Sequence, residues 1–150
     1  MHHCSEDIGF LIKQISGKMQ AHADAEMKCT ELTYSQFHVL GYLARHGMEA
    51  PQKEIEEFLG VSHPTVAGLV KRLESKGFVA TRADEQDRRT KLVRLTDKAL
   101  ALGDHMREER RKGEEKLRGS LTPAEAEELL RLLKIVYANI LSEEGTSSNR

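Results

Sequence analysis

The sequence predicts a mainly α-helical protein with one small β-hairpin, and three observations support this fold class. In several segments, apolar residues recur at the spacing of a helix face. Thr33 and Thr122 each precede such a segment at the position of a helix cap. Aromatic residues make up 5% of the chain and tryptophan is absent, which argues against a large β-sandwich. With 150 residues, we expect a single domain over residues 1–150.

The first part of the chain predicts two helices. The first covers about residues 5–28, with Ser5 as its cap. The second begins after Thr33 and ends near Gly47. Thr33 and Gln36 are spaced as a capping box, in which each side chain bonds to the backbone N–H of the other. The apolar face of the first helix consists of Ile8, Leu11, Ile12, Ile15 and Met19.

Residues 52–75 predict two short helices that meet at a sharp corner. Gly60 ends the first helix, and Ser62 is placed to cap the second with Pro64 in its first turn. The opposite face of the second helix is small, polar and basic. Such a surface fits a DNA major groove, because small residues permit close approach and cations neutralise phosphate. The buried face of this helix is expected at i, i+3, i+4 and i+7, on Val66, Leu69, Val70 and Leu73.

A basic hairpin follows this helix pair. Gly77 is placed to end the second helix, and residues 79–82 and 91–95 are predicted as two strands around a polar tip. Between Ser62 and Arg94 the chain has eight basic and four acidic side chains, although its total net charge is −1. This distribution places a basic head on an acidic body and directs phosphate to one end of the molecule. The alternative interpretation is a solvated charged surface.

Two longer helices are predicted after the hairpin. One begins at Thr96 and becomes highly charged up to Arg118. The last begins at Thr122 and Pro123, with Glu125 completing a capping box, and continues to about residue 142. Residues 143–150 are expected to form a frayed tail. The apolar residues of the last helix are Leu129, Leu130, Leu133, Val136, Tyr137 and Ile140.

Four groups of residues occur together in this order: Leu32-Thr33 with Gln36-Phe37, Val61-Ser62 with Thr65-Val66 and Leu69-Val70, residues 73–79, and Asp87-Arg88-Arg89 with Leu95-Thr96. With this set, nearly the whole chain resembles the MarR-type winged helix-turn-helix regulators. The resemblance implies a winged helix-turn-helix over about residues 32–95 and dimerisation helices over about residues 5–28 and 96–142. It also implies a homodimer that binds double-stranded DNA at a pseudo-palindromic operator, usually as a repressor released by a small ligand or by oxidation.

The resemblance places the fourth helix in the major groove and the hairpin, or wing, in the adjacent minor groove. Ser62, His63, Pro64 and Thr65 stand at the helix end where recognition helices meet bases, and Thr65 is the expected base contact. Lys71 and Arg72 are expected to hold phosphates.

In the wing, Arg89 is the first choice for the minor-groove contact and Arg88 the second, and Lys91 is a further basic candidate. We expect Asp87 to brace one guanidinium while a second arginine reaches the DNA. The alternative is a solvated charged turn.

Effector and redox sites are less well specified by the sequence. For a phenolic or carboxylate effector, a pocket between the first, second and fifth helices needs a cation, which Arg45 or His46 would supply. The resemblance places Gly9 where peroxide-sensing members carry a reactive cysteine, so a reversible ligand is favoured over oxidation at Cys4 or Cys29. Scattered histidines suggest no metal site, although a metal-responsive regulator of the same fold stays an alternative.

Catalytic motifs are missing from the sequence: it contains no GxSxG, P-loop, HExxH or CxxC pattern. We therefore expect no enzymatic activity and no cofactor. No apolar run approaches the roughly 20 residues of a membrane span, and the start lacks the apolar region of a signal peptide, which predicts a cytoplasmic protein. The main alternative to a DNA-binding regulator is a helical dimer that binds another protein without binding DNA.

Overall fold

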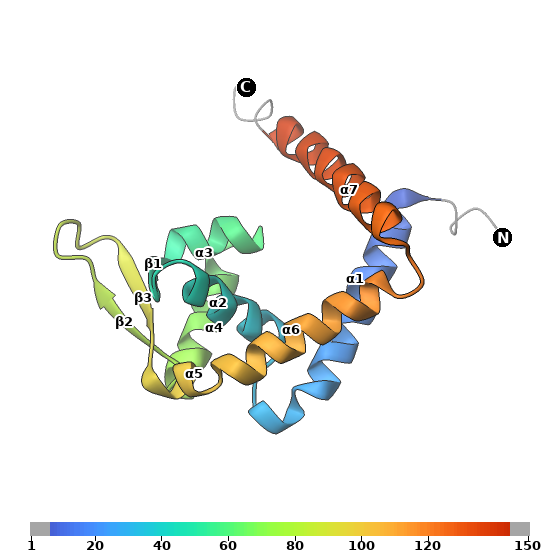
Figure 1. Cartoon of the computed structure of the whole chain (residues 1–150). Helices are drawn as coiled ribbons and strands as arrows, with labels where there is room; N and C mark the ends of the chain where they lie inside the picture. Colours follow the sequence, from blue (N-terminus) through green and yellow to red (C-terminus); the bar gives the residue numbers. More distant parts are fainter. Residues whose placement is uncertain (1–6, 145–150) are drawn as a thin grey trace. The chain divides into compact units, whose positions relative to one another are not determined.

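The computed structural model describes residues 7–144 (Figure 1). The chain consists of two compact units, one up to Arg110 and one from Arg111. The described part is mainly helical, with one small antiparallel sheet, as the sequence predicted. Its elements, in chain order, are α1 (Ile8–Glu26), η1 (Lys28–Thr30), α2 (Tyr34–Arg45), β1 (Glu49–Pro51), α3 (Gln52–Leu59), α4 (His63–Ser75), β2 (Val79–Ala83), β3 (Lys91–Leu95), α5 (Asp97–Ala101), α6 (Gly103–Arg118) and α7 (Pro123–Glu144).

Capping boxes form at the starts of α2 and α7, as predicted. The hydroxyl of Thr33 accepts from the Gln36 N–H, and the Gln36 side chain accepts from the Thr33 N–H. Thr122 and Glu125 form the same reciprocal pair at the start of α7. At α1 the prediction was wrong, because Asp7 rather than Ser5 is the N-cap and accepts from the Phe10 N–H at 3.2 Å. Ser5 itself lies outside the described residues.

Two left-handed glycines form the ends of α3 and α4. Gly60 has φ 64° and turns the chain between the two helices. Gly77 has φ 81° and follows the last turn of α4, where its N–H donates to the Glu74 carbonyl and the Phe78 N–H donates to the Leu73 carbonyl. This pair of bonds is a Schellman motif, which satisfies carbonyls that a helix end leaves without partners. The chain therefore leaves α4 in a fixed direction and enters β2.

The wing is part of a three-stranded sheet with the order β1-β3-β2, in which all neighbours are antiparallel. The hairpin of β2 and β3 was predicted, whereas β1 was missed. Val79 pairs with Leu95 at the base of the hairpin and Ala83 pairs with Lys91 near its tip. Ala50 of β1 pairs with Val93. Because β3 is held on both sides, the base of the wing is fixed to the helical body.

The core of the first unit lies between α2, α3, α4 and the sheet. Val66, Leu69, Val70 and Leu73 of α4 are buried, as their spacing predicted. They join Val39, Leu40, Leu43, Ile55 and Val93 in one hydrophobic cluster. Phe58 of α3 is 43% exposed, and its ring packs against Tyr42 at the edge of this core.

The predicted fifth helix is two helices. α5 ends at Ala101 and α6 begins at Gly103, with Leu102 between them. The break falls beside glycine, which has the lowest helix propensity apart from proline. α7 extends to Glu144, two residues beyond the predicted end. The rest of the predicted tail, residues 145–150, lies outside the described part.

Candidate nucleic-acid interface

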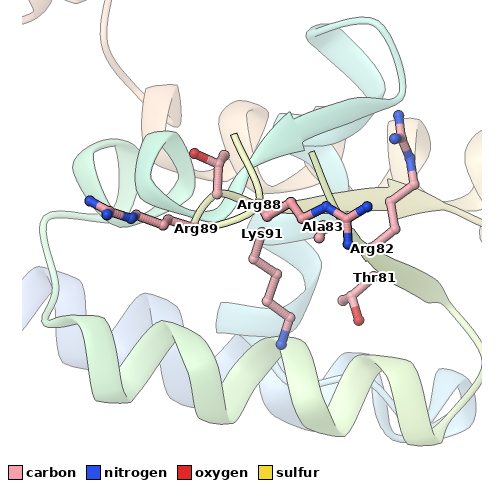
Figure 2. Close-up of a pocket in the computed structure, with 7 residues that line it drawn as sticks. Thr81, Arg82, Ala83, Arg88, Arg89 and Lys91 are labelled. Carbon is pink, nitrogen blue, oxygen red and sulfur yellow. The ribbon is translucent and has the colours of Figure 1, made fainter. Parts of the chain in front are cut away.

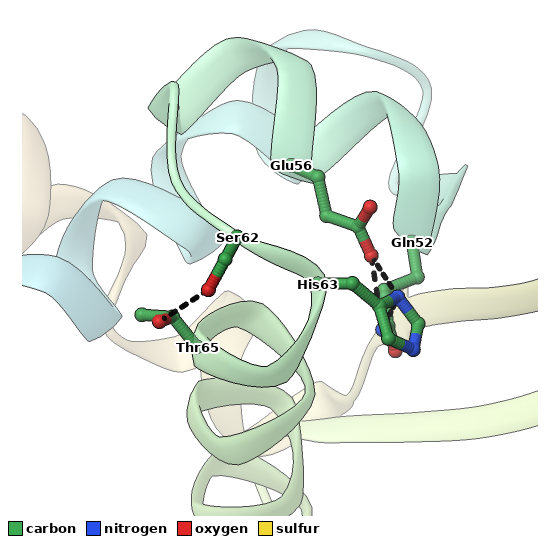
Figure 3. Close-up of polar contacts among 5 residues, drawn as sticks. All are labelled: Gln52, Glu56, Ser62, His63 and Thr65. Carbon is green, nitrogen blue, oxygen red and sulfur yellow. Dashed lines mark hydrogen bonds and ion pairs between the residues drawn. The ribbon is translucent and has the colours of Figure 1, made fainter.

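The amino-terminal turn of α4 presents Ser62, His63, Pro64 and Thr65 to solvent. Ser62 stands at the N-cap position, but its hydroxyl bonds to the hydroxyl of Thr65 at 2.9 Å rather than to a backbone N–H (Figure 3). This bond holds the Thr65 side chain at the start of the helix. Ser62 makes no side-chain cap bond to the first backbone N–H groups of α4, and the positive end of a helix dipole attracts phosphate.

The basic residues of α4 have different roles in the structure. Lys71 and Arg72 are exposed, and within residues 7–144 no ion pair to either side chain is found. Lys76 was counted in the basic head, but its amino group donates to the Glu31 carbonyl and, at 3.1 Å, to Gln36 Oε1. The carbonyl of Lys76 in turn accepts from Lys98 at 2.7 Å. The amino group of Lys76 therefore joins the end of α4 to the start of α2.

The wing carries an open basic pocket of about 280 Å³ (Figure 2). Two of its cations differ in their partners. Arg82 pairs with Glu49 of β1 at 2.8 Å, whereas the side chain of Arg89 has no acidic partner among the contacts of the described residues. The pocket is thus suited to an anion such as a phosphate group. Its lining residues are Thr81, Arg82, Ala83, Arg88, Arg89, Thr90 and Lys91.

Asp87 braces the tip of the wing through the backbone. Its carboxylate accepts from the Arg89 N–H at 3.1 Å and from the Thr90 hydroxyl at 3.3 Å. The predicted contact to a guanidinium is not among the contacts of the described residues. Because the Asp87 carboxylate accepts from a backbone N–H and a hydroxyl group, it does not bind the guanidinium groups of Arg88 and Arg89. Both guanidinium groups are therefore available to bind an anion.

Glu74 fixes the middle of β2 in the wing to α4. One oxygen of its carboxylate accepts from the Thr81 N–H at 3.0 Å and from the Thr81 hydroxyl at 2.5 Å. Together with the pair between Glu49 and Arg82, this contact ties β2 to both α4 and β1. The two elements that carry the exposed basic residues, α4 and the wing, are therefore held in one geometry. Sequence reasoning missed both ties, because each joins residues from different elements.

The two effector candidates occupy different environments at the end of α2. The ring of His46 stacks on Tyr42 with centroids 4.0 Å apart, and its Nδ1 donates to the Tyr42 carbonyl at 2.8 Å. The side chain of Arg45 runs back along α2 toward Gly41. A Cβ atom placed on Gly41 would lie 3.6 Å from Arg45 Nη1. Partial burial and then the charge of Arg110 lower the pKa of Arg45. Arg45 therefore shares a locally positive region with Arg110 of α6.

His38 belongs to the same positive region and was missed as a site residue. Burial lowers its pKa, and the charges of Arg45 and Arg110 lower it further. The ring also packs edge-on against Tyr34, with centroids 4.3 Å apart. His38 follows Tyr34 by four residues and precedes Arg45 by seven, so all three lie on one face of α2. This spacing could have identified His38 from the sequence. Arg110 had no such signal, because it comes from a distant helix.

Metal and thiol sites find little support in the described part of the chain. Among residues 7–144, no group of three or more His, Cys, Asp or Glu side chains is placed to hold a metal ion. Cys29 lies in η1, and Cys4 lies outside the described residues. Within the same range, no helix combines the length and apolar character needed to cross a membrane.

Comparisons with known proteins agree with this geometry. The family model described as "MarR family" matches residues 30–90, which span the helix-turn-helix and most of the wing. The structure of the Staphylococcus aureus MepR–DNA complex superposes with a TM-score of 0.81 at 27% identity, covering 89% of this chain and 96% of that one. Over residues 30–90 the chain matches the MarR family, and the relatives in these comparisons are transcriptional regulators. The protein is a DNA-binding transcriptional regulator and not an enzyme.

Two further relatives extend the comparison. An uncharacterised HTH-type transcriptional regulator of Bacillus subtilis, YdgJ, is 29% identical over 94% of this chain and 73% of its own length. BpsR of Bordetella bronchiseptica, whose DNA binding is regulated by 6-hydroxynicotinic acid, superposes with a TM-score of 0.81 at 28% identity. That superposition covers 91% of this chain and 97% of BpsR.

Proposed function

We propose that this protein is a ligand-responsive repressor that acts as a homodimer on a pseudo-palindromic operator. The observation that carries the proposal is the exposed basic surface formed by α4 and the wing, whose two elements are tied together by Glu74 and Thr81. In this assignment residues 32–95 form the DNA-binding head, and the helices before and after it form the dimer. Two heads related by twofold symmetry place their recognition helices about one helical turn apart.

Exposed apolar faces support the homodimer. The side chains of Leu11, Ile12 and Ile15 in α1 are each at least 39% exposed in the single chain, although they share a helix face. In α7, Leu129, Leu133 and Ile140 are at least 43% exposed. Faces of this extent on a monomer mark an interaction surface. A second copy of the chain is the proposed cover, and sedimentation at micromolar concentration tests it against the 16.9 kDa monomer.

The direct test of the function is footprinting on the DNA upstream of the protein's own gene. We expect two protected half-sites with a common centre of symmetry, and repression of a reporter placed behind them. A protein-interaction dimer with no DNA-binding function would give no sequence-specific protection at any salt concentration.

Thr65 and Lys71 distinguish base recognition from phosphate binding. Changing Thr65 to Ala should alter the preference at one base pair per half-site, with a loss of roughly 1–3 kcal/mol at the preferred base. Changing Lys71 to Ala should weaken all sequences about equally and reduce the salt slope by about two units per dimer. Fluorescence anisotropy on a panel of operator variants at several salt concentrations measures both. A uniform loss from Thr65→Ala would show that α4 is placed differently on the DNA.

The effector of this regulator is proposed to be a small aromatic carboxylate held by Arg45. The support is the positive region of Arg45, Arg110 and His38. Burial and then the charge of Arg110 lower the pKa of Arg45, and burial and then the charges of both arginines lower the pKa of His38. An anion bound in this region offsets the repulsion between the neighbouring positive charges and so stabilises their charged forms. The regulation of BpsR by an aromatic carboxylate points to the same class of compound. Oxidation of Cys29 or Cys4 is the alternative trigger, and peroxide treatment of a Cys4→Ser, Cys29→Ser variant distinguishes it.

Changing Arg45 to Ala should raise the concentration of 6-hydroxynicotinic acid or benzoate needed to release the operator by roughly tenfold to 100-fold. In the wild-type protein, binding of the carboxylate should raise the pKa of His38, because the anion offsets the charges that lower it. A histidine NMR titration with and without the compound measures that change. Arg107→Ala, an exposed arginine paired with Asp104 on α6, is the control and should leave the release unchanged. Equal effects of the two variants would exclude Arg45 as the anion site.

A further inference from the structure

Glu56 and His63 meet across the corner between α3 and α4 (Figure 3). His63 is the first residue of the recognition helix, and its Nδ1 lies 2.5 Å from Glu56 Oε1. The side chain of His63 is 72% exposed, whereas that of Glu56 is 18% exposed. The carboxylate therefore contacts Nδ1 on the less exposed side of the imidazole, and the rest of the ring is accessible to a ligand from solvent.

This contact decides which ring nitrogen carries the hydrogen. A carboxylate only accepts, so Nδ1 is the donor, and in the neutral ring Nε2 is left as an acceptor, for which the described residues provide no hydrogen-bond partner. Gln52 Nε2 lies 3.3 Å from the same Glu56 oxygen and 3.5 Å from His63 Nδ1. Because Nε2 of Gln52 and Nδ1 of His63 are both donors, the shared carboxylate is the partner of each.

Gln52 supplies a second donor to Glu56. The residue is buried with 4% exposure, and among the described residues its Oε1 has no hydrogen-bond partner. The bond from its Nε2 to Glu56 Oε1 is therefore the contact that orients the amide. Two donors from two helices converge on Glu56 Oε1 at the start of α4.

We infer that Glu56 is a positioning residue of the DNA interface, which fixes His63 in the Nδ1–H tautomer and presents Nε2 to a base edge. The inference rests on the proposed DNA-binding function. An outward acceptor matches the amino group of adenine N6 or cytosine N4 in the major groove, and it does not match the two acceptors of guanine. Glu56 thus contributes to base preference without touching the DNA.

Three substitutions test this role. Glu56→Ala removes the acceptor, Glu56→Gln keeps an amide oxygen that accepts the same bond, and Glu57→Ala removes an exposed carboxylate from the same helix. The Ala variants lose the same charge, so their difference isolates the contact with His63. Circular dichroism confirms that each variant is folded. Nitrogen-15 NMR of the imidazole in alkaline buffer, assigned with His63→Gln, reports the tautomer without any DNA.

We expect the Nδ1–H form in the wild type and in Glu57→Ala, and the Nε2–H form in Glu56→Ala. Operator selection should show loss of preference at one base pair per half-site in Glu56→Ala, with affinity for the preferred operator reduced by roughly fivefold or more. Glu56→Gln should restore much of both properties. Equal tautomer populations in the two Ala variants, or an unchanged base preference in Glu56→Ala, would overturn the inference. Absence of specific DNA binding by the wild type would instead contradict the proposed function.

Discussion

Changing Leu133 to Glu in α7 should convert the dimer to a monomer and weaken operator binding by at least about 100-fold. Leu133 is 43% exposed in the single chain and lies among other exposed apolar residues of α7. If a second copy covers this face, the substitution buries an unpaired carboxylate in each subunit, which costs about 3–5 kcal/mol per charge. A monomer then binds a single half-site and loses the gain from simultaneous engagement of both.

Analytical ultracentrifugation and operator titration measure this result together. Ala124→Glu is the matched control, because it adds the same charge in the first turn of α7, where a negative charge favours the helix. We expect the control to remain dimeric and to bind as the wild type does. A Leu133→Glu protein that still sediments as a dimer would place the dimer contact elsewhere.

Removing both wing arginines should have the second largest effect. In the Arg88→Ala, Arg89→Ala variant we expect a loss of well over tenfold in operator affinity, and a salt slope reduced by roughly 3–4 units per dimer. The physical reason is that the turn held by Asp87 leaves both guanidinium groups available for phosphate or the minor groove. The affinity should fall on all DNA sequences, with the largest fall where a narrow minor groove flanks the operator.

The control for the wing is the Lys13→Ala, Lys18→Ala variant. It removes two positive charges from exposed positions of α1, away from the basic head. Its salt slope should be close to that of the wild type. If the wing variant also keeps the wild-type slope, Arg88 and Arg89 belong to a solvated charged turn, which was the alternative that the sequence left open.

Features encoded by neighbouring residues were predictable from the sequence. The capping boxes at Thr33 and Thr122, and the buried stripe of α4, require only side chains three or four residues apart. The end of α4 at Gly77 was equally local, because glycine adopts the left-handed conformation at little cost. The break at Leu102 was missed, since the Ala and Leu residues on its amino-terminal side favour a continuous helix.

Features that join distant segments were not predictable in the same way. β1 contains three residues and ends at a proline, and only its pairing with β3 more than forty residues later makes it a strand. The contact between Glu56 and His63 likewise depends on the angle between two helices. Individual candidates such as Arg45 were found by residue type, whereas their partner Arg110 required the packing of α6.

The bridge made by Lys76 bears on how a ligand signal reaches the DNA. It links the end of the recognition helix to Glu31 and Gln36 at the start of α2, and α2 also carries Arg45. A displacement of α2 therefore carries α4 with it, so each head moves as a block and keeps its own shape. In the proposed ligand-responsive dimer, the quantity that an effector changes is then the separation of the two heads. The operator is then released because the distance between the two heads no longer matches the fixed distance between the half-sites, although each DNA-binding surface keeps its shape.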